Sequence, residues 1–335
     1  MKKILLIYTG GTIGMHHDGK GVLRPFDFDK INEQVPELKK LDAIIDHYAF
    51  AELIDSSNVQ PQFWIDLALL IEKKYNLYDG FVILHGTDTM AYSASALSFM
   101  LENLGKPVIF TGSQLPLGAI RTDAKRNLVT TIELAATGVS LPEVCIYFSS
   151  QLFRGNRVEK FTSSQFDAFQ SLNYPALAET GVDIQYNELR ILPLPKKKLK
   201  VHKQLNPHIG LIRIFPGITG QWMNNVLSTT GLKAVVLETY GSGNAPTDKW
   251  FIQALQNAID KGIVILNVSQ CSGGKVEQGK YETSYHLKKI GVISGSDITT
   301  EAALTKLMFL FGQGLELKKI EKLLTQSLRG EQSVN

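Results

Sequence analysis

The sequence predicts a two-domain α/β protein in which short buried strands alternate with helices. Three observations indicate this fold: apolar runs of strand length that end in glycine and polar residues, amphipathic segments between them, and a lapse of the pattern near residue 200. Runs buried on both faces and separated by helical segments are typical of parallel strands in βαβ units. The runs are ILLIYTGGTIG (4–14), GFVILHGTDT (80–89), KPVIFTGSQ (106–114), EVCIYFSSQ (143–151), IGLIRIFPG (209–217), KAVVLETYGSGN (233–244) and GIVILNVSQCSGG (262–274).

The segments between these runs carry the apolar spacing of amphipathic helices. The helices are expected at Pro61 to Asn76, Met90 to Leu104, Asp123 to Thr137, Thr247 to Lys261 and Thr299 to Phe311. Polar residues recur where the strands end, and in open parallel sheets ligands bind at the carboxyl ends of the strands. We therefore expect the functional site at that edge.

The lapse near residue 200 indicates a linker. Residues 190–208 read RILPLPKKKLKVHKQLNPH, and their three prolines interrupt both ladders and helices. This predicts an N-terminal catalytic α/β domain over residues 1–189, with a mostly parallel sheet flanked by helices. A smaller parallel α/β domain is expected over residues 209–335, and its tail from Arg329 onward is expected to fray.

The composition excludes several classes of partner. Lys+Arg 35 against Asp+Glu 32 gives a net charge of only +3, too small a field to argue for nucleic acid. No run approaches the roughly 20 apolar residues of a membrane span, and the apolar run at the amino terminus is too short for a signal peptide. Two cysteines, Cys145 and Cys271, fit a reducing compartment. We expect a cytoplasmic protein with a small-molecule substrate.

The polar clusters after the first two runs each have a purely structural explanation. The glycine turn before Thr12 follows neither the dinucleotide nor the Walker spacing, and Thr12 fits a helix cap as well as a functional group. Thr87, Asp88 and Thr89 are also favoured helix caps, but capping needs only one of them. Because two of these three residues exceed what capping requires, they predict a functional site that the two strand ends share.

Such a collection of groups is suited to acyl transfer. Thr111, Gly112 and Ser113 end a third run in the same way, so hydroxyls, a carboxylate and glycine N–H groups would line one cleft. A threonine nucleophile needs a base. His85 is expected to be a packed structural residue, and Lys160 is a candidate that chemistry alone does not single out.

At this point the chain resembles a known family. YTGGTIGM, LIDSSNVQP, GFVILHGTDTMAYSASALSFMLENLGKPVIFTGSQLPL, RGNRVEKF, YGSGNAP and GVISGSDITTEAALTKL together resemble the bacterial type I, cytoplasmic L-asparaginases over nearly the whole chain. The resemblance implies hydrolysis of L-asparagine to L-aspartate and ammonia through an acyl-enzyme, without metal or organic cofactor. It also implies a homodimer with sites at the subunit interface, or a tetramer of paired dimers.

The resemblance also assigns roles to residues. Thr12 in TGGTI is the implied nucleophile, and Thr87 in HGTDT would activate water in contact with Lys160 and Asp88. Asp88 would also bind the substrate's α-ammonium, and Asp55, Ser56 and Ser57, mainly Ser56, would hold its α-carboxylate. N–H groups near Gly11 and Thr87 would stabilise the oxyanion. The Ser113 carbonyl would contact the leaving amide, and Asn244 would reach a neighbouring subunit's site.

Two departures from the family pattern stand out. Many members carry a tyrosine in the mobile loop after TGGTI, but residues 16–25 read HHDGKGVLRP, so Thr87 with Lys160 would have to deprotonate Thr12. A metal at His16, His17 and Asp18 is a weaker interpretation than a solvated lid. Some members also have an activating asparagine site with an arginine where this chain has Glu238, which would repel a carboxylate.

Two other functions compete with the hydrolase. A nucleotide-binding or dehydrogenase role rests only on the glycine turn and the α/β pattern. The asparaginase-like subunit of a tRNA-dependent amidotransferase is expected to carry an extra amino-terminal domain, and here the first strand starts almost at Met1. The preference for asparagine over glutamine depends on one methylene and stays open.

Overall fold

The computed structural model describes residues 1–17, 23–25, 31–279 and 282–333, which form two compact units, 1–203 and 204–335. The unit boundary lies inside the segment 190–208 that was predicted as a linker. Part of that segment belongs to the first unit, because β14 (Lys200–Val201) pairs with β6 (Leu101–Glu102).

The first unit is built on an eight-stranded sheet with the order β13-β12-β9-β8-β7-β5-β1-β4. The strands from β4 to β8 are parallel, whereas β9, β12 and β13 are antiparallel to their neighbours. The sheet strands are β1 (Lys2–Tyr8), β4 (Ala43–Ala49), β5 (Gly80–Leu84), β7 (Val108–Thr111), β8 (Val144–Phe148), β9 (Gln151–Arg154), β12 (Ala178–Thr180) and β13 (Ile184–Tyr186). Two hairpins, β2 (Met15–His17) with β3 (Leu23–Pro25) and β10 (Glu159–Lys160) with β11 (Phe169–Gln170), complete the unit's strands among the described residues.

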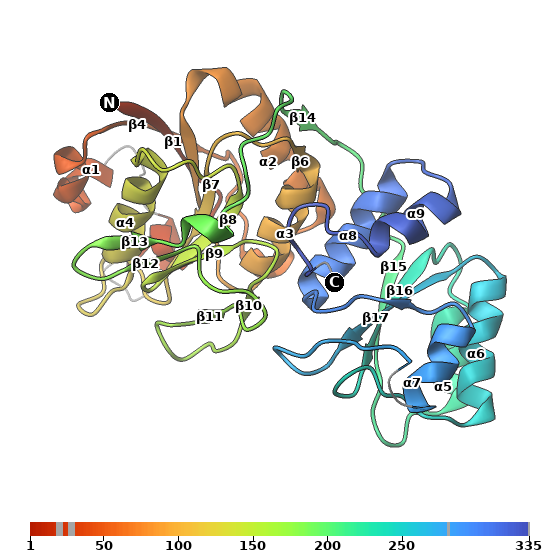
Figure 1. Cartoon of the computed structure of the whole chain (residues 1–335). Helices are drawn as coiled ribbons and strands as arrows, with labels where there is room; N and C mark the ends of the chain where they lie inside the picture. Colours follow the sequence, from red (N-terminus) through yellow and green to blue (C-terminus); the bar gives the residue numbers. More distant parts are fainter. Residues whose placement is uncertain (18–22, 26–30, 280–281, 334–335) are drawn as a thin grey trace. The chain divides into compact units, whose positions relative to one another are not determined.

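Helices cover both faces of this sheet (Figure 1). Helix α4 (Ala124–Ala136) packs on one face, against Ile4, Leu6 and Tyr8 of β1. Leu5 and Ile7 point to the opposite face, where α2 (Pro61–Lys74) and α3 (Met90–Met100) lie, because successive side chains of a strand alternate. This double burial explains why the strands are continuous apolar runs. A short helix, α1 (Ile31–Gln34), precedes β4.

The second unit contains the parallel sheet β15-β16-β17-β18. Its strands are β15 (Ile209–Arg213), β16 (Ala234–Thr239), β17 (Val264–Ser269) and β18 (Ile293–Ser294), and its helices are α5 (Gly220–Leu227), α6 (Lys249–Asp260), α7 (Glu282–Lys289), α8 (Thr300–Gly312) and α9 (Leu317–Leu324). Side chains from α5, α6 and α7 form the core on one face, and α8 contacts the strands from the other (Figure 1). The predicted α/β class, with a mostly parallel sheet in the first unit and a smaller parallel sheet in the second, is confirmed.

The carboxyl-terminal tail does not fray as expected. Glu331 and Gln332 are buried, and Ser333 donates hydrogen bonds of 2.7 Å and 2.6 Å to Asp297. The Glu331 carboxylate receives Lys306 of α8 at 2.6 Å, with both side chains fully buried. The prediction was wrong because the residues that anchor the tail, Asp297 and Lys306, lie well before it in the sequence. No described helix has the length and apolar character needed to cross a membrane.

Candidate active site

Thr12 begins a single 3-10 turn directly after β1. The turn η1 spans Thr12–Gly14, and the residues before it, Gly10 and Gly11, have φ angles of 129° and 88°. Glycine adopts such values without strain, so the chain can reverse abruptly after the strand. The Tyr8 phenol donates a 2.9 Å hydrogen bond to the last carbonyl of the turn. Burial raises the pKa of Tyr8 to about 12, so the phenol remains a donor.

The turns after β1 and β5 touch through two glycines. A Cβ atom added to Gly11 would lie 2.5 Å from the nitrogen and 2.7 Å from the Cα of Gly86, closer than side chains tolerate. Gly11 directly precedes Thr12, and Gly86 directly precedes Thr87. Because the parallel strands β1 and β5 are neighbours, their carboxyl ends lie at the same edge. The structure therefore brings the two predicted threonines to adjoining positions.

Lys160 connects the second threonine to a carboxylate. Its Nζ donates hydrogen bonds of 2.8 Å to Thr87 Oγ1 and 2.7 Å to Asp88 Oδ1. The Lys160 side chain is 17% exposed, whereas Asp88 is 62% exposed and faces solvent. The lysine stands on the β10–β11 hairpin, seventy-three positions after Thr87. A hydroxyl, an amine and a carboxylate in direct contact can exchange protons, which is what activation of a weak oxygen nucleophile requires.

A third loop packs against the same turns. Asp55 caps the 3-10 turn η4 (Ser56–Asn58) by accepting hydrogen bonds from the Ser57 backbone N–H at 2.9 Å and from its hydroxyl at 2.8 Å. These bonds, the backbone one first, hold the pKa of Asp55 below its usual range. Ser56 is buried, and a Cβ atom on Gly86 would lie 2.5 Å from its Oγ. The loops that carry Gly11 and Ser56 therefore both pack on the backbone of Gly86, which lies in the loop after β5.

The loop after β7 reaches the same edge, but its serine hydroxyl is turned inward. Ser113 is buried and its Oγ donates a 2.6 Å hydrogen bond to the Leu115 carbonyl. The Asp123 carboxylate accepts the backbone N–H groups of residues 114 and 115 and so fixes the loop. Gly112 lies against the His85 carbonyl with no room for a side chain. The Ser113 hydroxyl is therefore bonded within its own loop.

His85 is a packed residue, as its sequence context indicated. Its Nδ1 lies 2.7 Å from the Gly86 carbonyl, and its Nε2 lies 2.9 Å from Ser93 Oγ, which also accepts a 2.9 Å hydrogen bond from Trp64 Nε1. A carbonyl only accepts, so Nδ1 carries the proton and Ser93 donates to Nε2. Burial lowers the pKa of His85 to about 4, and the ring is neutral near pH 7.

Two residues singled out in the sequence lie in the second unit. Asn244 closes a tight turn after β16, where its backbone N–H and carbonyl bond to Tyr240 at 2.8 Å and 2.9 Å. Glu238 is buried at the end of the same strand. Its carboxylate accepts a 2.6 Å hydrogen bond from Thr300 and lies 3.4 Å from Arg213. The negative charge at this position is therefore held by partners of its own unit.

Of the predicted site residues, the structure groups Gly11, Thr12, Ser56, Thr87, Asp88 and Lys160 at the edge formed by β1, β5 and the β10–β11 hairpin. Sequence reasoning gave no role to Gly86 or Tyr8. The sequence signal that could have identified Gly86 is that a glycine directly precedes each of the two threonines. The predicted lid over residues 16–25 falls partly outside the described residues, at 18–22. Among the described residues, no group of three or more His, Cys, Asp or Glu is arranged to hold a metal ion.

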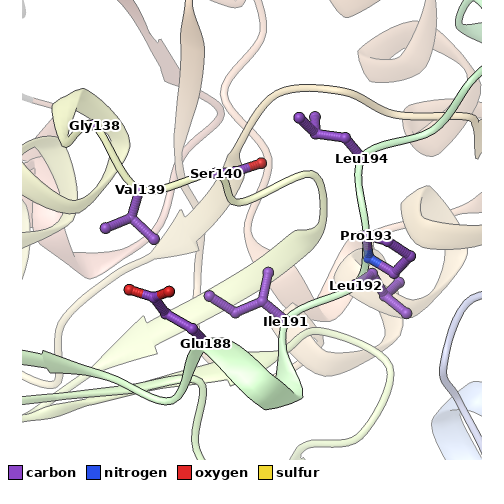
Figure 2. A pocket seen from close by; sticks show the side chains of 8 residues that line it. All are labelled: Gly138, Val139, Ser140, Glu188, Ile191, Leu192, Pro193 and Leu194. Atoms are coloured by element: carbon purple, nitrogen blue, oxygen red, sulfur yellow. The ribbon is translucent and has the colours of Figure 1, made fainter.

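The pocket in Figure 2 is lined by none of the residues of this cluster. It has a volume of about 620 Å³ and is lined by Gly138, Val139, Ser140, Glu188, Ile191, Leu192, Pro193 and Leu194. Residues 138–140 precede β8, so the pocket lies at the amino end of that strand, whereas the polar cluster follows carboxyl ends. Its side chains are mostly apolar, with one carboxylate and one hydroxyl (Figure 2). The direct contact of a hydroxyl, an amine and a carboxylate occurs at the threonine cluster.

The chain is similar to known proteins along nearly its whole length. The profile of the family "Asparaginase, N-terminal" matches residues 3–191, and that of the "Glutaminase/Asparaginase C-terminal domain" matches residues 208–324. The chain is 45% identical over 334 residues to L-asparaginase 1 of Escherichia coli (strain K12), covering 98% of both chains. It is 31% identical over 343 residues to a glutamyl-tRNA(Gln) amidotransferase chain of Pyrococcus abyssi, covering 99% of this chain and 77% of that one.

Among solved structures, L-asparaginase I from Vibrio cholerae O1 biovar eltor matches with a TM-score of 0.92 and 40% identity, covering 99% of both chains. The two family profiles span most of the sequence, and the Escherichia coli relative matches it nearly end to end. The chain therefore belongs to the asparaginase family, with its amino-terminal and carboxyl-terminal parts matching the two parts of that family in order.

Proposed function

We propose that this protein hydrolyses L-asparagine to L-aspartate and ammonia through an ester on Thr12. The Thr12 oxygen attacks the side-chain carbonyl carbon, the carbon–nitrogen bond breaks, and ammonia leaves with the proton that the hydroxyl gives up. Water, activated by Thr87, then attacks the ester, and L-aspartate leaves as Thr12 regains its proton. The contact between Gly11 and Gly86 is the observation that carries this proposal, because it brings together the two loops that bear Thr12 and Thr87.

The two charged ends of the substrate orient its amide. Asp88 takes the α-ammonium, and the loop of Asp55, Ser56 and Ser57 takes the α-carboxylate through N–H and hydroxyl groups, mainly those of Ser56. Binding both ends orients the carbonyl toward Thr12 before attack. Backbone N–H groups at Gly11 and Thr87 stabilise the oxyanion. The family's remaining contacts fall on the Ser113 carbonyl and on Asn244, the latter reaching a neighbouring subunit's site.

Lys160 supplies the proton path that the missing lid tyrosine would otherwise provide. It contacts Thr87 Oγ1 and Asp88 Oδ1 at once, and it is mostly shielded from solvent. The proton of Thr12, or later of water, passes to Thr87 as Thr87 gives its own proton to Lys160 and Lys160 gives one to Asp88. The proton then leaves with ammonia in the first step and returns to Thr12 in the second. In this proposal the same pair serves both steps, deprotonating Thr12 first and water second. The protein works in the cytoplasm, as a homodimer or a tetramer of paired dimers, without a cofactor.

Ammonia release from L-asparagine and L-glutamine, measured side by side on the purified protein, tests the proposed function. We expect release from asparagine, and the glutamine rate then gives the discrimination for one methylene. Adding NAD should leave the unfolding temperature unchanged, because a ligand that does not bind does not stabilise. A protein that releases no ammonia from asparagine but is stabilised by NAD would support the nucleotide-binding alternative.

The velocity curve for asparagine is expected to be hyperbolic. The Glu238 carboxylate stands where an activating site in some family members has an arginine, and a second substrate carboxylate would be repelled there. Thr300 and Arg213 already bind this side chain. Initial velocities over a wide range of asparagine concentrations measure the Hill coefficient, which should be about 1. A clearly sigmoidal curve for the wild type would contradict the expectation.

A further inference from the structure

Thr89 occupies a helix-capping position but does not cap its helix. It is the N-cap residue of α3, and threonine at this position usually accepts a hydrogen bond from a backbone N–H of the first turn. No such bond is present. The hydroxyl instead donates a 2.7 Å hydrogen bond to the carbonyl of Ser56, thirty-three positions earlier in the chain. The side chain therefore serves a contact between loops rather than its own helix.

This hydrogen bond is the shorter of two that the Ser56 carbonyl accepts. The other comes from the Val59 N–H of the same turn and is 3.3 Å long. On its other side, Ser56 Oγ packs against the Gly86 backbone, where there is no room for a Cβ atom. Ser56 is thus held by the loop after β5 from two directions, through Gly86 and through Thr89. Asp55 fixes only the interior of the Ser56 loop.

We propose that Thr89 is a positioning residue that sets the distance between the two sites for the charged ends of the substrate. The inference rests on the proposed function, in which Asp88 takes the ammonium and Ser56 the carboxylate. Asp88 precedes Thr89 directly, so one residue and one hydrogen bond join the two sites. An α-amino acid has its ammonium and carboxylate on one carbon, and a fixed short separation between the two sites selects that head group.

A positioning role and a purely structural role of Thr89 predict different changes in KM, kcat and the unfolding temperature. A loosened carboxylate site weakens binding of the ground state and the transition state alike, which raises KM and leaves kcat unchanged. General loosening of the helix start would instead lower the unfolding temperature and disturb Thr87, on which turnover depends. The ratio of the two kinetic constants separates the alternatives.

The test compares Thr89→Val, which keeps the shape and removes the hydroxyl, with Thr89→Ala and Thr89→Ser. We expect Val and Ala to raise the KM for asparagine about tenfold, the scale of one lost hydrogen bond to a binding loop. The inhibition constant of L-aspartate should rise by the same factor, and kcat should change by less than about twofold. Thr89→Ser should restore both constants.

Thr137→Val is the matched control. Thr137 also donates to a backbone carbonyl, that of Leu134 at 3.1 Å, but it stands at the end of α4, away from the three loops. We expect this variant to keep the wild-type constants. Unchanged KM and aspartate inhibition in both Val and Ala variants, or a fall in kcat at constant KM, would overturn the proposal. If wild type released no ammonia from asparagine, or Thr12→Ala kept full activity, the proposed function would fail instead.

Discussion

Replacing Thr12 by alanine is expected to lower the turnover of asparagine by about 10⁴-fold or more, because the oxygen that forms the covalent bond is removed. Thr87→Ala is expected to cost a similar factor, since it removes the hydroxyl that Lys160 contacts at 2.8 Å. Residues that act as one unit show losses that do not add, so the double variant should be little worse than either single one. Ammonia release at saturating asparagine measures all three.

The matched control for this pair is serine. Thr12→Ser and Thr87→Ser keep a hydroxyl at each position and should retain far more activity than the alanine variants. Circular dichroism and thermal unfolding should show that all variants are folded, because both side chains lie at a solvent-accessible edge rather than in a core. An alanine variant at either position that keeps turnover within tenfold of wild type would remove that threonine from the mechanism.

The second large effect is expected on stability, at the buried pair that anchors the tail. Glu331 accepts Lys306 Nζ at 2.6 Å and the backbone N–H groups of Leu328 and Arg329. Burial pushes the pKa of Glu331 upward, but Lys306 and these N–H groups outweigh it and hold the pKa below its usual range. Glu331→Gln leaves a buried ammonium without its counter-charge and should lower the free energy of unfolding by about 3–5 kcal/mol.

Urea unfolding of the wild type and its variants measures this cost. The double variant Lys306→Met with Glu331→Leu removes both charges and should recover most of the lost stability, because a buried ion pair contributes little over apolar side chains of similar size. Lys125→Met is the exposed comparison, since Lys125 lies 2.6 Å from Glu37 with both side chains about two-fifths exposed. It should change the free energy of unfolding by less than about 1 kcal/mol. A loss below about 1 kcal/mol for Glu331→Gln would contradict the burial of the pair.

Much of the fold was predictable because burial on both faces leaves a strong pattern. All seven predicted runs contain strands, and the five predicted helices appear as α2, α3, α4, α6 and α8. Strand β4 was missed, because it is an edge strand that is largely exposed and reads AIIDHYA, without a continuous apolar run. Helix α7 reads ETSYHLKK and is too polar to stand out. The apolar pattern of the sequence reflects burial, so elements with little buried surface are not predicted from it.

The candidate site was predictable where residue types cluster and not where geometry decides. Thr12, Thr87 and Asp88 follow strand ends, so the α/β pattern alone places them at one edge. Lys160 lies on a two-residue strand with no distinguishing pattern, and only the family resemblance marked it. The direction of the Thr89 hydroxyl could not be predicted, because a cap and a bridge between loops require the same residue type. Steric fit between Gly11 and Gly86 likewise appears only in the folded chain.

Mass spectrometry of the Thr87→Ala variant after prolonged mixing with asparagine tests the central claim most directly. Both steps are slowed in this variant, and the second is slowed more because Thr87 also activates the attacking water, so the ester should accumulate until the reaction is stopped with acid. The account predicts a mass increase of one aspartyl group on the peptide that contains Thr12. An aspartyl group on any other peptide, or ammonia release by the wild type that persists undiminished in Thr12→Ala, would contradict it.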